Sequence, residues 1–280
     1  MLASRERKGN AVVGMNTLGC TGKMVWPILI ATILLLAGCG DARVSGVPPS
    51  GSRSTARESA ADAGSILRLA RATRQAGDVA ASVQLYRSLA ASRSVTPEVQ
   101  VEFGDVLVEA GSPDEAIDIY SQIDSRSPAR PGALLGMTRA YLNLGDPAKA
   151  LEYAGEAQRL APLDARVLID KGVALDTLNR HAEAQELYRA VLVATPRHVS
   201  ARNNLALSLA LTGQYDEALA LIGPLVRSSS ATPRERENMA IIYGLMGDAD
   251  RATMLSRVDL DEETTRSNLK FFATVRGSKQ

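Results

Sequence analysis

Cysteine and histidine are the residue types in this chain best suited to catalysis or metal binding, and the sequence holds two of each. His181 is predicted to begin a helix and His198 to lie in a turn after Pro196. No Ser/His/Asp grouping, metal-ligand spacing or phosphate-cradling glycine loop accompanies them in the sequence. We therefore expect two solvated histidines, no catalytic residue, no metal site and no enzymatic activity.

Cys39 is the residue with the clearest chemical role. It ends the sequence "LAGC" after an apolar run, 24–37, which has the length of a signal-peptide core and is short for a membrane span of roughly 20 residues. Lys23 gives this run a positive flank. The pattern resembles the bacterial lipobox, which implies cleavage before Cys39 and covalent lipidation of its sulfur. The alternative is a short membrane anchor with an incidental cysteine.

The lipobox divides the N-terminal part of the chain. Residues 1–38 are predicted to be a lipoprotein signal peptide, and 39–62 the lipidated cysteine with a flexible tether rich in Gly, Pro, Ser and Ala. Gly40 follows the cysteine, which resembles an outer-membrane address in the enterobacterial sorting rule. We expect a lipid anchor on the periplasmic face of the outer membrane of a Gram-negative bacterium, and no other cofactor.

The remaining chain repeats with a period of 34 residues, and any binding site must be positioned by these repeats. A turn residue recurs with this period: Gly77, Gly111, Gly145, Asn179, Gly213 and Gly247. A small residue follows five positions after each: Ser82, Ala116, Ala150, Ala184, Ala218 and Ala252. Six units in one register predict a repeat array.

Each unit has the pattern of two helices joined by a turn. In 199–232, apolar residues recur at helical spacing, Gly213 ends the first helix, and Ala218 begins the apolar face of the second. The unit resembles the tetratricopeptide repeat (TPR). The resemblance implies an all-α TPR solenoid of about six helix–turn–helix repeats, followed by a capping helix and tail in 261–280. The predicted repeats are 63–96, 97–130, 131–164, 165–198, 199–232 and 233–260.

The TPR resemblance also implies a binding face on the first helices, which line the concave side of such arrays. The basic and Asn pair that some TPR domains use to hold a peptide carboxylate is missing at the matching positions, so that mode is disfavoured. An apolar groove that suits a helix or an apolar peptide remains. The alternative is that the C-terminal helix fills part of it. The predicted face comprises Leu135, Arg139, Leu142, Ile169, Val173, Asp176, Asn203, Leu207, Leu211, Ile241 and Leu245.

Charge balance weighs against a nucleic-acid partner. The chain holds 32 Lys and Arg against 31 Asp and Glu, a formal net charge of +1. Binding to a polyanion depends on a concentrated positive field, which this balance does not supply. We therefore expect protein partners, contact with the membrane through the lipid, and no nucleic acid.

The last repeats, together with the lipobox and tether, indicate which family of TPR lipoproteins the chain resembles. The lipobox, the tether and the phrases "RNNLALSLALTGQYDEALALI", "RENMAIIYGLMGD" and "VDLDEETTRSNLKFF" resemble TadD, the TPR lipoprotein of Flp (tight adherence) pilus assembly. The resemblance implies a non-enzymatic scaffold that aids assembly of the pilus or its secretin, in the manner of a pilotin. The alternatives are a type IV pilus pilotin, an outer-membrane-protein assembly factor, and a subunit of a cell-envelope enzyme.

Overall fold

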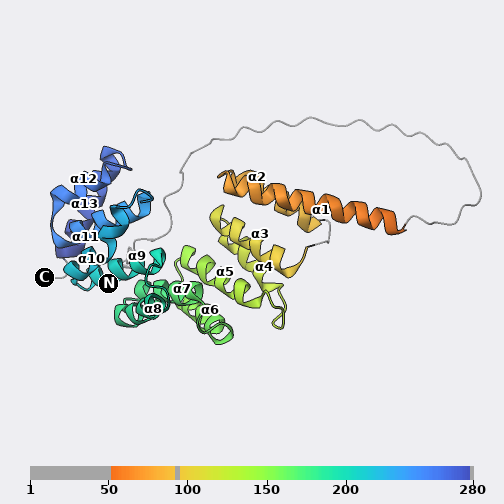
Figure 1. Ribbon diagram of the computed structural model, residues 1–280, viewed down its shortest axis with the longest axis horizontal. Coiled ribbons are helices and arrows are strands. Elements are labelled where there is room, and N and C mark those ends of the chain that lie inside the picture. Colours follow the sequence, from red (N-terminus) through yellow and green to blue (C-terminus); the bar gives the residue numbers. More distant parts are fainter. Residues whose placement is uncertain (1–51, 92–94, 278–280) are drawn as a thin grey trace, which may run out of the picture. The chain divides into compact units, whose positions relative to one another are not determined.

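The structure is a computed structural model that describes residues 52–91 and 95–277 (Figure 1). In these residues every regular element is a helix, so the all-α prediction is confirmed. The helices belong to two compact units, one that ends at Val95 and one that begins at Thr96. The predicted signal peptide and Cys39 lie outside the described residues.

The first unit is a helical hairpin. Helix α1 (Ser52–Gln75) packs against α2 (Val79–Ala91), and the hydroxyl of Ser82 donates a hydrogen bond of 2.9 Å to the carbonyl of Ala70. The helix α1 begins before residue 63, so the flexible tether predicted to reach residue 62 is wrong for 52–62. The reason is composition, because this stretch lacks Gly and Pro and contains Ala, Arg and Glu, which favour helix.

The second unit contains five helical hairpins and a final helix, each hairpin being two helices joined by a short turn. These are α3 (Pro97–Glu109) with α4 (Pro113–Ser121), α5 (Arg130–Asn143) with α6 (Pro147–Leu160), α7 (Ala165–Thr177) with α8 (His181–Ala194), α9 (Val199–Leu211) with α10 (Tyr215–Val226), α11 (Pro233–Met246) with α12 (Ala249–Ser256), and α13 (Glu262–Gly277). The helix–turn–helix prediction is thus confirmed.

The turn residues adopt the backbone conformation that the period predicts. All five repeating glycines have positive φ, for example +82° at Gly213, and Asn179 has φ of 60°. This left-handed region is open to Gly and is tolerated by Asn, whose short side chain lowers the steric cost. Asn179 therefore continues the turn pattern at the one position without Gly.

Small side chains let the two helices of a hairpin approach closely. The predicted small residues of the second helices, Ser82 to Ala252, are all completely buried. A Cβ placed on Gly172 of α7 would lie 2.4 Å from a ring carbon of Tyr188 of α8, and one on Gly104 of α3 would lie 2.4 Å from Tyr120 of α4. In both hairpins an aromatic ring fills the space that a side chain would need.

Within the second unit, the first helix of each hairpin also packs against the first helix of the next. The contacts run from α3 to α5, α7, α9, α11 and α13 in turn. Helix α13 packs on both α11 and α12, as α11 packs on α9 and α10. It thus continues the array where a further first helix would begin, an arrangement that favours capping over occupation of the face formed by the earlier first helices.

Candidate functional site

The eleven residues predicted to bind a partner lie on four consecutive first helices. Helix α5 carries three of them, α7 and α9 three each, and α11 two. These helices pack side by side, from α5 to α7, α9 and α11. The structure therefore places residues that span more than a hundred positions of sequence, from Leu135 to Leu245, on one row of four helices.

Burial divides this predicted face into two groups. Six of its residues are buried, namely Leu135, Ile169, Asp176, Asn203, Leu207 and Leu245. These six pack within the array and offer a partner little surface. The other five are partly exposed: Arg139, Leu142, Val173, Leu211 and Ile241. We call these five the open first-helix face. Four of the five are apolar.

Arg139 links three consecutive hairpins. Its Nε lies 2.7 Å from Oδ2 of Asp170 on α7, and its Nη1 lies 3.9 Å from Oδ1 of Asp105 on α3. The hydroxyl of Tyr120 donates a hydrogen bond of 2.9 Å to the same Asp105 oxygen. The guanidinium charge is thus matched by two carboxylates. This arrangement fits the expectation that the face does not bind a free peptide carboxylate.

Asp176 is the centre of a buried polar cluster between the fourth and fifth predicted repeats. Its side chain is 2% exposed, and its oxygens accept hydrogen bonds from Ser208 Oγ at 2.7 Å and Tyr188 Oη at 3.0 Å, while His181 Nδ1 lies at 2.8 Å. Burial raises the pKa of the Asp176 carboxyl, and its three partners offset part of that rise. The cluster joins α7, α8 and α9, so we assign Asp176 to packing rather than to partner binding.

The histidines are less solvated than the sequence predicts. The prediction is wrong for His181, whose side chain is 17% exposed because it turns inward to Asp176. His198 caps α9, where its Nδ1 accepts a hydrogen bond of 3.3 Å from the backbone NH of Ala201. Both rings therefore have structural partners.

The Asp176 cluster brings Ser, His and Asp together, which the sequence does not predict, yet its order differs from that of a catalytic triad. In a triad the histidine lies between the serine and the aspartate and accepts the serine proton. Here Ser208 and His181 both bond to Asp176, and Ser208 is completely buried. The geometry supports cohesion of the array and places the carboxyl of Asp176, rather than the His181 ring, beside the serine hydroxyl.

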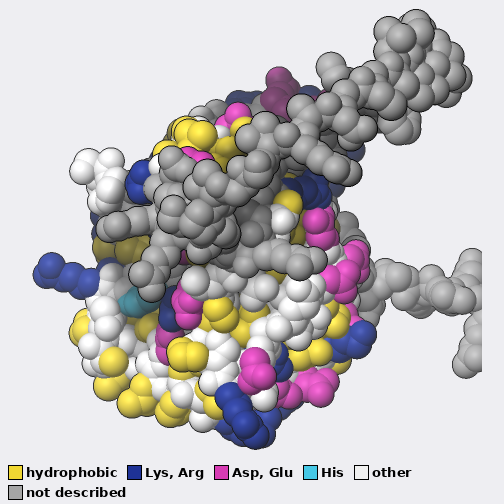
Figure 2. Space-filling view, turned by 90° about the vertical axis from the view of Figure 1, so that its right-hand side faces the viewer, with side chains coloured by type: hydrophobic (Ala, Val, Ile, Leu, Met, Phe, Trp, Pro, Cys, Tyr) yellow, Lys and Arg dark blue, Asp and Glu magenta, His cyan; other side chains and the backbone are white. Residues whose placement is uncertain are grey.

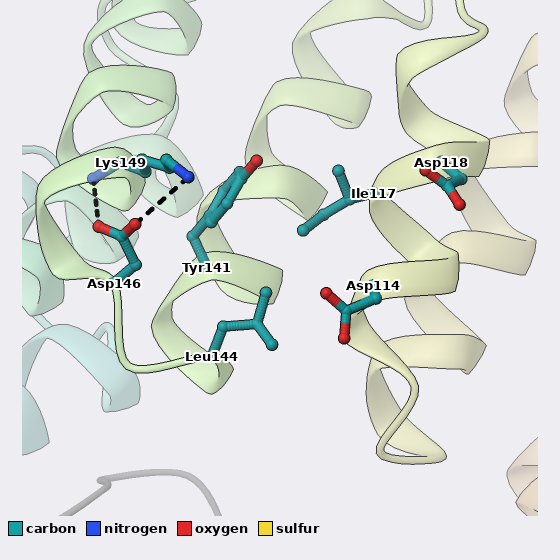
Figure 3. A pocket seen from close by; sticks show the side chains of 7 residues that line it. All are labelled: Asp114, Ile117, Asp118, Tyr141, Leu144, Asp146 and Lys149. Carbon is teal, nitrogen blue, oxygen red and sulfur yellow. Dashed lines mark hydrogen bonds and ion pairs between the residues drawn. The ribbon is translucent and has the colours of Figure 1, made fainter.

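A second feature, a hollow of about 390 Å³, lies between α4 and the α5–α6 hairpin (Figure 3). Helix α4 contributes two carboxylates and an apolar side chain, and the α5–α6 turn region contributes an aromatic ring, an apolar side chain and an ion pair. In Figure 3 the Tyr141 ring stands between Lys149 on one side and Ile117 on the other. We call this site the acidic-aromatic hollow; it is lined by Asp114, Ile117, Asp118, Tyr141, Leu144, Asp146 and Lys149.

Sequence reasoning missed this hollow because it followed the first-helix positions alone. Asp114 and Asp118 are four residues apart, a spacing that places both on one side of a helix, and this was the available signal. Tyr141 and Leu144 lie at the end of the first helix of the next repeat. Only the packing of one hairpin on the next shows that these groups meet.

Three further features bear on function: the arrangement of potential metal ligands, the apolar character of the helices, and the distribution of charge on the surface. Among residues 52–91 and 95–277, no group of three His, Cys, Asp or Glu side chains is arranged to hold a metal ion. Within the same ranges no helix is both long and apolar enough to cross a bilayer. Where described atoms are visible, Figure 2 shows acidic, basic and hydrophobic side chains intermingled, in keeping with the near-zero net charge.

Comparison with known proteins identifies the repeats. One tetratricopeptide repeat profile matches residues 107–169, and a second matches 67–131 and 169–222. An uncharacterised protein of Sinorhizobium fredii, y4yS, is 34% identical over 90 residues, which are 32% of this chain and 50% of that protein. Cellulose synthase 2 operon protein C of Komagataeibacter xylinus is 29% identical over 163 residues, 58% of this chain and 12% of that protein. The chain thus spans half or less of these two relatives.

Solved structures match the fold. A tetratricopeptide repeat protein from Parabacteroides merdae has a TM-score of 0.62 at 15% identity, over 75% of this chain and 84% of that one. A thermophilic TPR protein of Thermus thermophilus has a TM-score of 0.54 at 22% identity, over 64% of this chain and 98% of that one. At these identities the likeness shows a shared fold alone.

Proposed function

Because the chain belongs to the tetratricopeptide repeat family and is a scaffold for protein–protein interaction, we propose that it serves at the periplasmic face of the outer membrane in assembly of an Flp-type pilus or its secretin. The observation that carries the proposal is a lipobox at Cys39 ahead of a TPR array. In this role the lipid supplies attachment to the membrane and the repeats hold the protein partner.

The resemblance to TadD supports the choice of partner. It is most specific in the last repeats and in the sequence "VDLDEETTRSNLKFF", residues 258–272, which forms the connection between α12 and α13 and the greater part of α13. A pilotin-like scaffold would keep a secretin subunit bound while the subunit reaches the outer membrane. No catalytic step is needed for this role, because binding alone prevents premature assembly.

The open first-helix face is the surface that we assign to the partner. Its apolar members, Leu142, Val173, Leu211 and Ile241, lie on four neighbouring helices and are partly exposed. Such a surface suits the apolar side of a helix or a short apolar segment of the partner. Burial of these side chains on binding would contribute roughly 25 cal/mol for each Å² of apolar area removed from water.

The anchor is tested by replacing the proposed lipidated residue. Cys39→Ser removes the sulfur to which the thioether is attached, and it leaves the apolar run intact. We expect loss of labelling by a radioactive or alkyne-tagged fatty acid, and loss of the protein from the outer-membrane fraction. Labelling equal to that of the unchanged chain would refute the lipobox assignment, and Cys20→Ser serves as the matched control.

The partner is tested by charge substitution on the open first-helix face. Val173→Asp and Ile241→Asp each place a carboxylate at a partly exposed position. When the partner covers this surface, the carboxylate becomes buried without a counter-charge, which opposes binding. We expect loss of co-purification with the secretin and loss of surface pili. Val193→Asp on α8 is the matched control, since Val193 is 84% exposed and lies on a second helix. Retention of both activities by the two face variants would exclude this surface.

A second candidate remains within the scaffold class. The likeness to Cellulose synthase 2 operon protein C favours an accessory role in an envelope enzyme complex, and a type IV pilus pilotin or an outer-membrane-protein assembly factor would use the same anchor. Identification of the proteins that co-purify with the lipidated chain separates these roles. A secretin with pilus proteins supports the first proposal, whereas synthase subunits in their place support the second.

A further inference from the structure

The acidic-aromatic hollow has an excess of negative charge that the described residues do not neutralise. It contains three carboxylates and one ammonium group. Asp146 is occupied by Lys149, since its carboxylate accepts a hydrogen bond of 3.0 Å from the Lys149 backbone and lies 3.5 Å from Nζ. Asp114 and Asp118 are exposed and pair with no Lys, Arg or His among the described residues. Two carboxylates therefore face solvent across the hollow.

Helix stability does not explain both of these carboxylates. Asp114 lies in the first turn of α4, where a negative charge interacts favourably with the helix dipole. Asp118 lies towards the last turn of the same helix, where a negative charge is unfavourable and a basic residue is preferred. The position of Asp118 thus opposes local stability, and a role in binding would account for it.

The Tyr141 ring offers a second means of holding a cation. It stacks on Tyr153 with centroids 5.2 Å apart and planes 4° apart, and Lys149 Nζ lies 5.1 Å from its centroid. Both neighbours belong to α6, and Figure 3 shows Ile117 on the opposite side of the ring. The face turned towards the hollow is therefore bordered by Ile117 and by Leu144, which is 41% exposed. A flat cation with an aliphatic stem matches these surfaces.

The next repeat provides an internal comparison. A hollow of about 260 Å³ lies one period further along, where Leu175 takes the place of Tyr141, Arg180 that of Asp146, and Glu183 that of Lys149. Its lining holds two acidic and two basic side chains. The repeat geometry is therefore shared by the two hollows, whereas the aromatic ring and the acidic excess occur in the first.

From these contacts we propose that the acidic-aromatic hollow binds an arginine side chain presented by a basic segment of the protein partner. The guanidinium stacks on the open face of Tyr141 and donates hydrogen bonds to Asp114 and Asp118, while its methylene groups lie on Ile117 and Leu144. Arginine fits better than lysine, because its planar group both stacks on a ring and bonds to carboxylates at fixed geometry. The carboxylates do not converge on a metal site, which favours an extended cation over an ion.

This inference rests on the proposed scaffold function and adds a chemical class of partner to it. The site lies on α4 and the α5–α6 hairpin and involves none of the residues of the open first-helix face. A partner could therefore place an apolar segment on that face and an arginine in the hollow. Two separate contacts on one partner raise the overall affinity beyond that of either contact.

The test uses the full chain in detergent with labelled Ile and Leu methyl groups, and the peptide acetyl-Gly-Ser-Arg-Ser-Gly-amide as the probe. We expect saturable chemical-shift changes at Ile117 and Leu144, with a dissociation constant on the order of 1 mM for so small a ligand. The citrulline peptide has nearly the same shape without the charge, and we expect it to bind about tenfold or more weakly. Equal shifts with both peptides, or no shift at Ile117 and Leu144, would overturn the proposal.

Matched variants locate the binding site. The double variant Asp114→Asn/Asp118→Asn changes exposed residues and is expected to weaken the arginine peptide about tenfold, as is Tyr141→Leu. Tyr141→Phe keeps the ring and should keep binding. The control Glu183→Gln/Glu186→Gln removes acidic groups from the neighbouring hollow and should have no effect. Full binding by the Asp114/Asp118 double variant would overturn the proposal, whatever the behaviour of Tyr141→Leu.

The two proposals fail separately in these measurements. If the peptide does not bind while the lipidated chain still co-purifies with a secretin, the arginine site is wrong and the assembly role stands. If the arginine peptide binds as expected and no pilus protein co-purifies, the hollow is supported and the assembly role is wrong.

Discussion

The Asp176 carboxyl connects three helices through hydrogen bonds, and its burial makes their stability depend on pH. Burial raises its folded-state pKa above the value of about 3.9 that is usual in an unfolded chain. A group of this kind stabilises the fold fully below the unfolded pKa, and the contribution is lost as pH rises through the folded pKa. The charged form is thus the less stable one in the folded array.

Asp176→Asn is expected to remove this pH-dependent contribution. As pH rises above about 4, the free energy of unfolding of the unchanged chain should fall relative to that of the variant. The reason is that Asp176 loses its proton over this range, whereas the asparagine side chain does not titrate. Urea unfolding of both proteins at a series of pH values measures this difference. A difference that stays constant from below pH 4 to neutral pH would contradict the assigned burial effect.

Gly172 is a residue at which a single methyl group should destabilise the array. A Cβ there would lie 2.4 Å from the ring of Tyr188, which is completely buried and hydrogen-bonded to Asp176. We expect Gly172→Ala to lower the free energy of unfolding by about 1–3 kcal/mol, the usual cost of overpacking. Thermal or urea unfolding measures the change.

Gly155 supplies the matched control for this substitution. It lies inside α6, and a Cβ at this position would have no atom within 4 Å. Gly155→Ala should therefore stabilise the chain by about 0.5–1 kcal/mol, because alanine restricts the unfolded state and favours helix. Shifts of the same sign in the two variants would show that close approach to Tyr188 is not what sets the cost.

Residues that recur with the period were predictable, and those that join different repeats were less so. The small residues and the turn glycines follow from the spacing because each has the same neighbours in every unit. Asp176 was predicted on the partner face from its position alone, whereas its burial depends on Ser208 from the next repeat. The acidic-aromatic hollow likewise depends on side chains from two hairpins. Such meetings are set by packing and leave no periodic signal.

The helices themselves were predictable wherever their ends carry a physical marker. Pro97 and Pro233 begin first helices, as Pro at the first position of a helix allows, and positive-φ residues follow the first helices. The start of α1 was missed because the segment before residue 63 carries no such marker and no apolar period. The composition of 52–62 indicates that this segment has too few apolar residues to pack in a core. Its helical conformation follows instead from the intrinsic helix propensity of its residues.

Helix α13 is expected to stabilise the end of the array through Phe272. This side chain is 6% exposed, and its ring occupies the space beside Gly244 on α11, where a Cβ would lie 2.2 Å from a ring carbon. Phe272→Ala should lower the free energy of unfolding by about 3–5 kcal/mol, the range for a buried aromatic side chain. Lys270→Ala on the exposed side of α13 is the matched control and should change stability by less than about 0.5 kcal/mol.

At the scale of the molecule, residues 96–277 form an array in which each hairpin contacts its immediate neighbours. Helix α9 packs on α7, α8, α10 and α11, whereas α13 packs on α11 and α12. Stability in such an array is close to a sum of terms for each repeat and each interface between neighbours. Helices at the C-terminal end have fewer interfaces, so they should open more often than those in the middle.

Hydrogen exchange resolved along the chain should show this gradient directly. Backbone amides of α7, α8 and α9 are expected to exchange most slowly in this unit, with exchange increasing through α11 and α12 to α13. Phe272→Ala should accelerate exchange in α11 and α12 and leave exchange in α5 and α6 nearly unchanged. In the described part of the chain, α13 packs on α11 and α12 and not on α5 or α6. Equal acceleration from α5 to α13 would instead mean that the array opens as one cooperative block, and the ends would then be as stable as the middle.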